Sequence, residues 1–261
     1  MMSKVHLKKW ESGSSGVKII FLHGFPLDHT IWQPVLPFLQ GSAHCILPDL
    51  RGHGESPVSE GVSTMLEMAD DVAGLMDDLG MERAVLVGHS MGGYISFAFA
   101  KAFPERLQGL ALVATHPLAD DEHKRLNRLQ TADTIEQTGV ETLAASMPAS
   151  LTSDPKIRAQ LQNIIRKISP AGAAAALRGM AEREESLSLL DKIQVPAVVI
   201  AGERDSIVPL SLAAEMASRL PKGKLVAIPN GGHMPMMEAP DQTAAALLEL
   251  VERVRLTTTQ L

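Results

Sequence analysis

Short apolar runs alternate with amphipathic segments along most of the chain. The runs are rich in Val, Ile and Leu, are bounded by Gly, Pro or Asp, and cover residues 17–24, 44–50, 84–89, 107–114, 195–203 and 224–229. Such runs are typical of parallel strands covered by helices on both faces. Residues 64–80 have helical spacing and end at Gly80, a residue that commonly ends helices. The pattern predicts an α/β fold with an open, mostly parallel central sheet flanked by helices, and residues 4–11 as an antiparallel edge strand.

The alternation stops between about His116 and Asp191. This stretch is charged, rich in Ala and spaced by Leu, and its prolines at 117, 148, 155 and 170 indicate helix starts or breaks. A helical insertion between two strands predicts a cap over the carboxyl edge of the sheet, where α/β folds bind ligands. We therefore expect a core of residues 1–115 and 191–261, with an inserted all-helical cap over residues 116–190.

Composition narrows the possible functions. The chain has 261 residues, 45% of them hydrophobic, with a net charge of -6. It carries no basic patch interleaved with aromatics, so we expect no nucleic-acid partner and no membrane association. The opening segment lacks the apolar core of a signal peptide, which predicts a cytoplasmic protein. Cys45 is the only cysteine, which leaves no disulfide framework and no multi-cysteine metal site.

The sequence "GHSMG" at residues 88–92 has the form G-x-S-x-G, directly after a predicted strand and directly before a predicted helix. In that context the pattern predicts a nucleophile elbow, a strained turn that lifts the hydroxyl of Ser90 above the sheet. The alternative is a serine that caps the following helix, because serine is a preferred N-cap residue.

A serine nucleophile needs a base, and the base needs a carboxylate to orient it. Asp205 lies in the loop after one late predicted strand, and His233 lies in the loop after the next. The order Ser, Asp, His along the chain is the order of this architecture. Glu203 is the alternative acid, Asp205 could instead cap the next helix, and His233 could be a structural loop histidine.

Ester hydrolysis also needs donors for the developing oxyanion. The backbone N–H of Met91, directly after the serine, is one candidate, and the backbone N–H of Phe25 in "HGFP" is the second. No step of this chemistry requires a cofactor or a metal, so we expect none.

Five blocks of the sequence together resemble the α/β-hydrolases: "FLHGFPLDHTIW", "LPDLRGHGES", "VGHSMGGY", "AGERDSIVP" and "IPNGGHMPMMEAP". The resemblance covers nearly the whole chain and is closest to the capped branch that includes carboxylesterases, enol-lactonases and cofactor-free haloperoxidases. It implies Ser90 as nucleophile, Asp205 as acid, His233 as base, and the amides of Phe25 and Met91 as oxyanion hole. Members of this fold with Asp at the nucleophile position, such as haloalkane dehalogenases, are disfavoured by Ser90.

Substrate is less well defined by the sequence. All nine aromatic residues lie between Trp10 and Phe103, so the predicted cap must line the pocket with aliphatic and Met side chains. We expect Trp32, His116 and Met147 to line the substrate pocket. Six cap arginines are expected mostly on solvated helix faces; they are Arg125, Arg128, Arg158, Arg166, Arg178 and Arg183.

The primary hypothesis is a carboxylesterase that cleaves esters of short to medium aliphatic acyl chains through an acyl-enzyme on Ser90. The alternatives are a lactonase, similar to 3-oxoadipate enol-lactonase, and a ligand receptor of the hydrolase fold with slow turnover. A perhydrolase side activity and a lyase are weaker possibilities. The expected partner is a small-molecule ester or lactone, and the sequence predicts neither its identity nor the oligomeric state.

Overall fold

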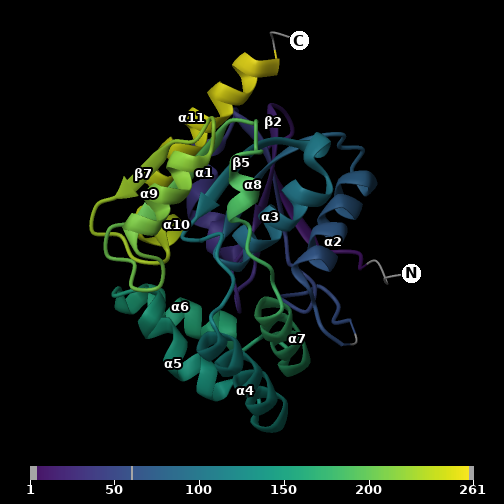
Figure 1. Ribbon diagram of the computed structural model, residues 1–261, viewed down its shortest axis with the longest axis vertical. Helices are drawn as coiled ribbons and strands as arrows, with labels where there is room; N and C mark the ends of the chain where they lie inside the picture. The colour runs from purple at the N-terminus through teal and green to yellow at the C-terminus, as the bar shows by residue number, and fades with distance from the viewer. Residues whose placement is uncertain (1–4, 60, 259–261) are drawn as a thin grey trace.

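A computed structural model describes residues 5–59 and 61–258. Its centre is a seven-stranded sheet in the order β1-β3-β2-β4-β5-β6-β7 (Figure 1). The strands are β1 (Lys9–Ser12), β2 (Val17–Leu22), β3 (Ala43–Pro48), β4 (Ala84–His89), β5 (Leu107–Val113), β6 (Ala197–Gly202) and β7 (Leu225–Ile228). Only β1 pairs antiparallel, with β3. The α/β fold and the antiparallel edge strand are confirmed, although the edge strand begins at Lys9 and Lys4 lies outside the described residues.

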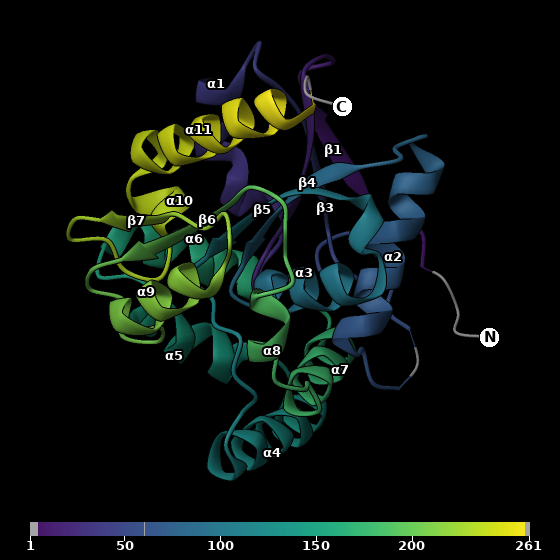
Figure 2. The same cartoon turned by 45° about the horizontal axis from the view of Figure 1, so that its top comes forward.

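Successive side chains of a strand point to opposite sides of the sheet. Because successive residues of these strands are apolar, both faces of the sheet are apolar. In β2, Ile20 and Leu22 pack in the core cluster formed with α2 (Met65–Asp78), α3 (Met91–Ala102) and α9 (Leu210–Arg219). Ile19 and Phe21 pack in the cluster formed with α11 (Pro240–Thr258) on the other face. Figure 2 shows α11 and α3 on opposite sides of the sheet.

Local sequence signals explain the main helix of the first half. Helix α2 begins with a capping box in which Thr64 and Glu67 exchange side-chain and backbone hydrogen bonds. It ends at Asp78, and Gly80 follows with a φ of 61°, as its position in the sequence predicts. The remaining short elements are η1 (His29–Val35), α1 (Leu36–Leu39), η2 (Pro104–Arg106), α8 (Leu187–Leu190) and α10 (Pro235–Glu238).

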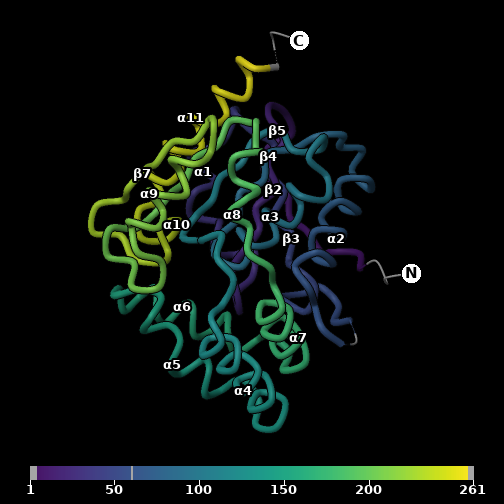
Figure 3. The backbone as a smooth tube through the Cα atoms, in the orientation of Figure 1, coloured from purple at the N-terminus to yellow at the C-terminus, as the bar shows by residue number. Residues whose placement is uncertain are grey.

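Four of the five helices between β5 and β6 gather at one end of the molecule, where the tube drawing shows the chain leaving the sheet and returning to it (Figure 3). We call them the helical insert: α4 (Glu122–Thr138), α5 (Glu141–Leu151), α6 (Pro155–Ile165) and α7 (Pro170–Ala181). Pro155 and Pro170 begin helices, as expected. The prediction for Pro148 is wrong. This residue neither starts nor breaks a helix but lies inside α5, three residues before its end.

Two glycines bring α7 into backbone contact with the core. A Cβ atom at Gly172 would lie 2.0 Å from the carbonyl oxygen of Gly52, and one at Gly179 would lie 1.8 Å from the carbonyl oxygen of Ser63. Between them, the Ser63 N–H donates to the carbonyl of Ala175 at 3.1 Å. Glycines spaced seven apart lie on one face of a helix, so this face of α7 is seated directly on two core loops.

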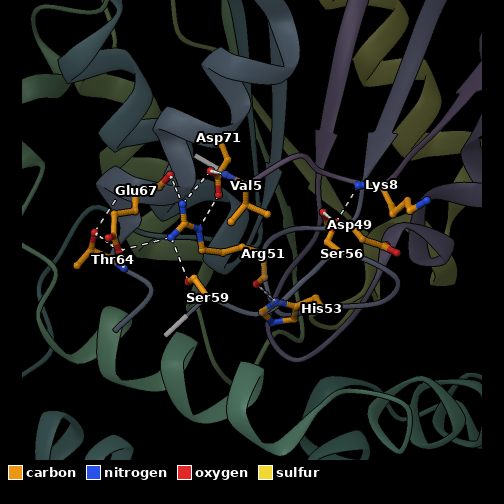
Figure 4. Close-up of polar contacts among 10 residues, drawn as sticks. All are labelled: Val5, Lys8, Asp49, Arg51, His53, Ser56, Ser59, Thr64, Glu67 and Asp71. Atoms are coloured by element: carbon orange, nitrogen blue, oxygen red, sulfur yellow. Dashed lines mark hydrogen bonds and ion pairs between the residues drawn. The ribbon is translucent and has the colours of Figure 1, made fainter. Parts of the chain in front are cut away.

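The loop after β3 is fixed by a buried ion pair (Figure 4). The Arg51 guanidinium donates to both carboxylate oxygens of Asp71, from Nε at 2.5 Å and from Nη2 at 2.8 Å. The same guanidinium reaches Ser59 Oγ at 3.2 Å, and the Arg51 carbonyl accepts from His53 Nδ1 at 3.0 Å. Bidentate pairs of this kind fix geometry as well as charge, so the loop that carries His53 is anchored to α2.

Within residues 5–59 and 61–258, none of the helices combines the length and the apolar character needed to cross a membrane.

Candidate active site

Ser90 stands between β4 and α3 in a backbone conformation that L-residues rarely adopt, with a φ of 50° and a ψ of −110°. Its N–H donates to the carbonyl of Val113 at 2.9 Å, and its carbonyl accepts from Thr115 Oγ1 at 2.8 Å. The Ser90 side chain makes no capping hydrogen bond to α3, so helix capping does not account for it. A strained turn that presents a partly exposed serine has the geometry of a nucleophile elbow.

Three glycines make this turn possible, because a side chain at any of them would collide with neighbouring atoms. A Cβ atom at Gly88 would lie 2.4 Å from the carbonyl oxygen of Gly92, and one at Gly92 would lie 2.3 Å from that of Leu22. A Cβ atom at Gly24 would lie 2.6 Å from His89 Nδ1. The β2 loop and the elbow are therefore in close contact.

Asp205 and His233 are joined by a hydrogen bond of 2.8 Å between Oδ2 and Nδ1. Asp205 follows β6 and His233 follows β7, so both stand at the carboxyl ends of strands, as Ser90 does. The second oxygen of Asp205 accepts from the backbone N–H groups of Ile207 at 2.8 Å and Val208 at 3.0 Å. Burial alone would raise the pKa of the Asp205 carboxyl, but these hydrogen bonds outweigh burial and lower it.

An ionised Asp205 only accepts hydrogen bonds, so His233 must carry a proton on Nδ1, which leaves Nε2 free to accept one in the neutral ring. The alternative acid, Glu203, has an exposed side chain that accepts instead from the backbone N–H of Asn230 at 3.3 Å. The structure therefore pairs His233 with Asp205.

His89 contributes a contact that the sequence does not reveal. Its Nε2 lies 2.9 Å from the carbonyl oxygen of His233, which requires the proton on Nε2, and the two rings lie 5.0 Å apart. Burial is the main cause that lowers the pKa of His89 to about 3. His89 therefore holds the backbone of the His233 loop.

Phe25 and Met91 flank the serine. Phe25 directly follows Gly24, where a Cβ atom would come within 3.2 Å of Ser90 Cβ, and its peptide bond to Pro26 is cis. Met91 is the first residue of α3 and is completely buried. Both backbone N–H groups thus belong to segments in contact with the elbow, and the one at the N-terminus of α3 adds the favourable end of a helix dipole.

The three residues expected in the substrate pocket have different surroundings. Trp32 is completely buried behind the elbow, 5.1 Å from the ring of Phe21 and 6.4 Å from that of His89. Met147 is half-buried on α5 and packs against both core clusters. His116 lines a cavity of about 770 Å³ between the core and the end of α7.

Apolar side chains of α2, α3 and α8 line part of this cavity, including Met65, Phe97 and Leu189. Charged side chains line it as well: Lys101, Glu182, Arg183, Glu184, Glu185 and Lys192. Its lining also includes Tyr94 and His116, joined by a hydrogen bond of 3.1 Å. Burial lowers the pKa of His116 to about 4 and raises that of Tyr94, so both are uncharged at neutral pH. Tyr94 lies one helical turn after Ser90, although the residues that line the cavity do not include Ser90, Asp205 or His233.

Two arginines of the predicted cap, Arg183 and Arg128, are expected on solvated helix faces but have mostly buried side chains. Arg183 is only 4% exposed and binds both oxygens of Asp120 at 2.9 Å, and Arg128 donates to Asp120 at 2.6 Å. The Arg183 guanidinium also lies 4.1 Å from the centre of the Tyr94 ring. The physical reason for this correction is the buried carboxylate of Asp120, which sequence spacing alone does not place.

Comparisons with known proteins identify the family of this fold. Residues 18–240 match the family model described as alpha/beta hydrolase fold. A solved structure of a thermophilic esterase from Thermogutta terrifontis, with malate bound, is 38% identical and has a TM-score of 0.92; the match covers 96% of this chain and 94% of that one.

Two curated relatives extend the comparison. A pimeloyl-[acyl-carrier protein] methyl ester esterase of Chromobacterium violaceum is 28% identical over 93% of this chain and 97% of its own. The dihydrolipoyllysine-residue acetyltransferase component of the acetoin cleaving system of Pseudomonas putida is 30% identical over 92% of this chain, which spans 65% of that protein. The chain therefore belongs to the alpha/beta hydrolase fold family.

Proposed function

We propose that the protein is a carboxylesterase that cleaves esters of short to medium aliphatic acyl chains with Ser90 as nucleophile, His233 as base and Asp205 as the orienting acid. The observation that carries the proposal is the buried Asp205–His233 hydrogen bond at the same sheet edge as the strained Ser90. The similarity to the thermophilic esterase supports the reaction class.

The reaction follows from these positions. Nε2 of His233 takes the Ser90 proton as Oγ attacks the ester carbonyl carbon, and the tetrahedral oxyanion is stabilised by the N–H groups of Phe25 and Met91. The C–O bond to the alcohol then breaks, and the alcohol leaves with the proton held by His233. Water, activated by the same imidazole, adds to the acyl-Ser90 and releases the carboxylic acid. No metal or cofactor enters any of these steps.

We further propose that the helical insert caps the site and that the cavity beside Tyr94 and His116 holds the aliphatic chain of the substrate. The apolar part of the lining, which includes Met65, Phe97 and Leu189, supports this assignment. Tyr94 and His116, the polar pair one helical turn from Ser90, are uncharged at neutral pH. An aliphatic chain gains free energy when it is buried against such apolar side chains.

The test is the initial rate on p-nitrophenyl esters from acetate to dodecanoate and on simple and enol lactones. For esters, Ser90→Ala should lower turnover on the order of 10⁴-fold or more. Ser218→Ala is the matched control, because Ser218 is an exposed serine of α9 whose hydroxyl donates to the carbonyl of Glu215. Near-normal ester turnover in Ser90→Ala would refute the mechanism, faster opening of lactones would reassign the substrate class, and wild-type inactivity on both would favour a receptor.

A further inference from the structure

The helical insert is in direct contact with the loop that carries His233. The backbone N–H of His233 donates to the carbonyl of Leu151, the last residue of α5, at 3.1 Å. The next insert residue, Thr152, is 4% exposed and donates its hydroxyl to Glu238 Oε1 at 2.5 Å. In the views of Figures 1 and 2, α10, which Glu238 ends, lies beside the α5–α6 end of the insert.

Glu238 completes the connection from its other oxygen. Oε2 accepts the backbone N–H of Gly232, the residue directly before His233, at 2.5 Å. A Cβ atom at Gly232 would lie 2.9 Å from Glu238 Oε1 and 3.4 Å from the Leu151 carbonyl oxygen, so the loop is pressed against both partners. One carboxylate therefore ties the backbone before His233 to a side chain of the insert.

Thr152 is itself held firmly by α6. Its hydroxyl accepts the backbone N–H of Asp154 at 3.2 Å, and its carbonyl accepts from Arg158 Nε at 2.7 Å. Asp154 in turn caps α6 through the N–H groups of its first turn. The Thr152 hydroxyl, which donates to Glu238, is therefore held in place by its hydrogen bond to the start of α6.

The contacts of His233 with Asp205 and His89 do not fix the backbone N–H side of the residue. Asp205 holds the ring through Nδ1, and His89 holds the carbonyl oxygen. The N-terminal side of the residue is positioned by the Leu151 carbonyl and, one residue earlier, by Glu238. A catalytic group that is misplaced by about 1 Å can lose on the order of 10²-fold in rate.

From these contacts we propose that Thr152 and Glu238 are positioning residues for His233. The packing of the helical insert against the core then determines where the base lies. The inference rests on the proposed function, because it needs His233 to act as the base. Neither residue touches the reacting atoms, and the effect passes through the Gly232–His233 backbone.

The test compares removal with conservative replacement at both positions. Thr152→Val and Glu238→Ala should each lower kcat for p-nitrophenyl butyrate by about tenfold or more, with KM within about twofold of wild type. Thr152→Ser keeps the hydroxyl. Glu238→Gln can still accept from Gly232 while its amide donates to Thr152 Oγ1. Both conservative variants should recover most of the lost kcat.

A second measurement separates positioning from a purely structural role. The proton NMR resonance of the His233 Nδ1–H, hydrogen-bonded to Asp205, should shift or broaden in Thr152→Val and return in Thr152→Ser. Thr142→Val is the matched control, because Thr142 is an exposed threonine at the other end of α5, and it should leave kcat and the resonance unchanged.

The outcomes are distinct. If Thr152→Val and Glu238→Ala only lower the melting temperature, while kcat well below it and the resonance stay at wild-type values, the positioning role is refuted. If Ser90→Ala and His233→Ala retain ester turnover, the proposed function itself is refuted, whatever the behaviour of Thr152 and Glu238.

Discussion

Lowering the pH from about 7.5 to about 5.5 should destabilise the folded protein through four buried histidines, which have an unperturbed pKa near 6.5. The pKa is lowered to about 4 in His23 and His116 and to about 3 in His53 and His89, with burial as the largest cause in each. The hydrogen bonds of His23 agree with a neutral ring, because its Nε2 accepts the backbone N–H of Leu50 at 2.9 Å.

The direction follows from proton linkage. Between the unfolded and folded pKa values, the unfolded chain binds a proton at each histidine and the folded protein does not, so stability is full above about pH 6.5 and falls as the pH drops toward 4. Each histidine contributes about 1.4 kcal/mol per pH unit within this window. At pH 5.5 the four together should lower the free energy of unfolding by about 5 kcal/mol, a large part of the total stability of an ordinary domain.

Carboxylates act in a separate window. The pKa of Asp205 and that of Asp49 are lowered by their hydrogen bonds despite burial, so their contributions are present above an unfolded pKa of about 4 and are lost only below it. The interval from pH 7.5 to 5.5 therefore isolates the histidines.

Urea unfolding followed by tryptophan fluorescence at constant ionic strength measures this slope. His53→Asn should remove about a quarter of the effect, about 1.4 kcal/mol at pH 5.5, since it removes one of four such groups. His123→Asn is the control, because His123 is exposed in the folded protein. A free energy of unfolding that changes by less than about 1 kcal/mol across the interval would refute the reasoning.

Three substitutions test other parts of the structure. Ala98→Leu, in the wall of the cavity, should lower rates on medium-chain esters relative to acetate by about tenfold, whereas exposed Ala159→Leu should not; parallel chain-length profiles would remove the cavity from the substrate site. Gly179→Ala should lower the free energy of unfolding in urea by about 2 kcal/mol, because its methyl group meets a core backbone oxygen. Asp120→Asn should lower it by about 3 kcal/mol by leaving Arg183 without its charge partner, and an unchanged midpoint would mean that the arginine is compensated elsewhere.

The parts of the fold that depend on local sequence could be predicted. Runs of Val, Ile and Leu contain the six parallel strands, since strands covered on both faces need apolar residues at every position. The elbow at Ser90 could also be located, because the flanking glycines are required by contacts within a few residues of the turn or with the adjacent strand.

The parts that depend on distant partners could not be predicted. Arg183 finds Asp120 across 63 residues, and Thr152 finds Glu238 across 86. Each side chain has the polarity of a surface residue, and only the tertiary packing of the chain brings it to its partner. Burial of polar groups is a property of pairs in space, whereas helical spacing reports only which face of one helix a residue occupies.

The crowded turn at Ser90 has a consequence for how this chain can change over evolutionary time. The three glycines around it tolerate no side chain, because a Cβ atom there meets backbone or ring atoms. The side chain of residue 90 itself is partly open to the outside. A lineage could exchange the reactive group at this one position for another small nucleophile while the surrounding architecture is inherited unchanged.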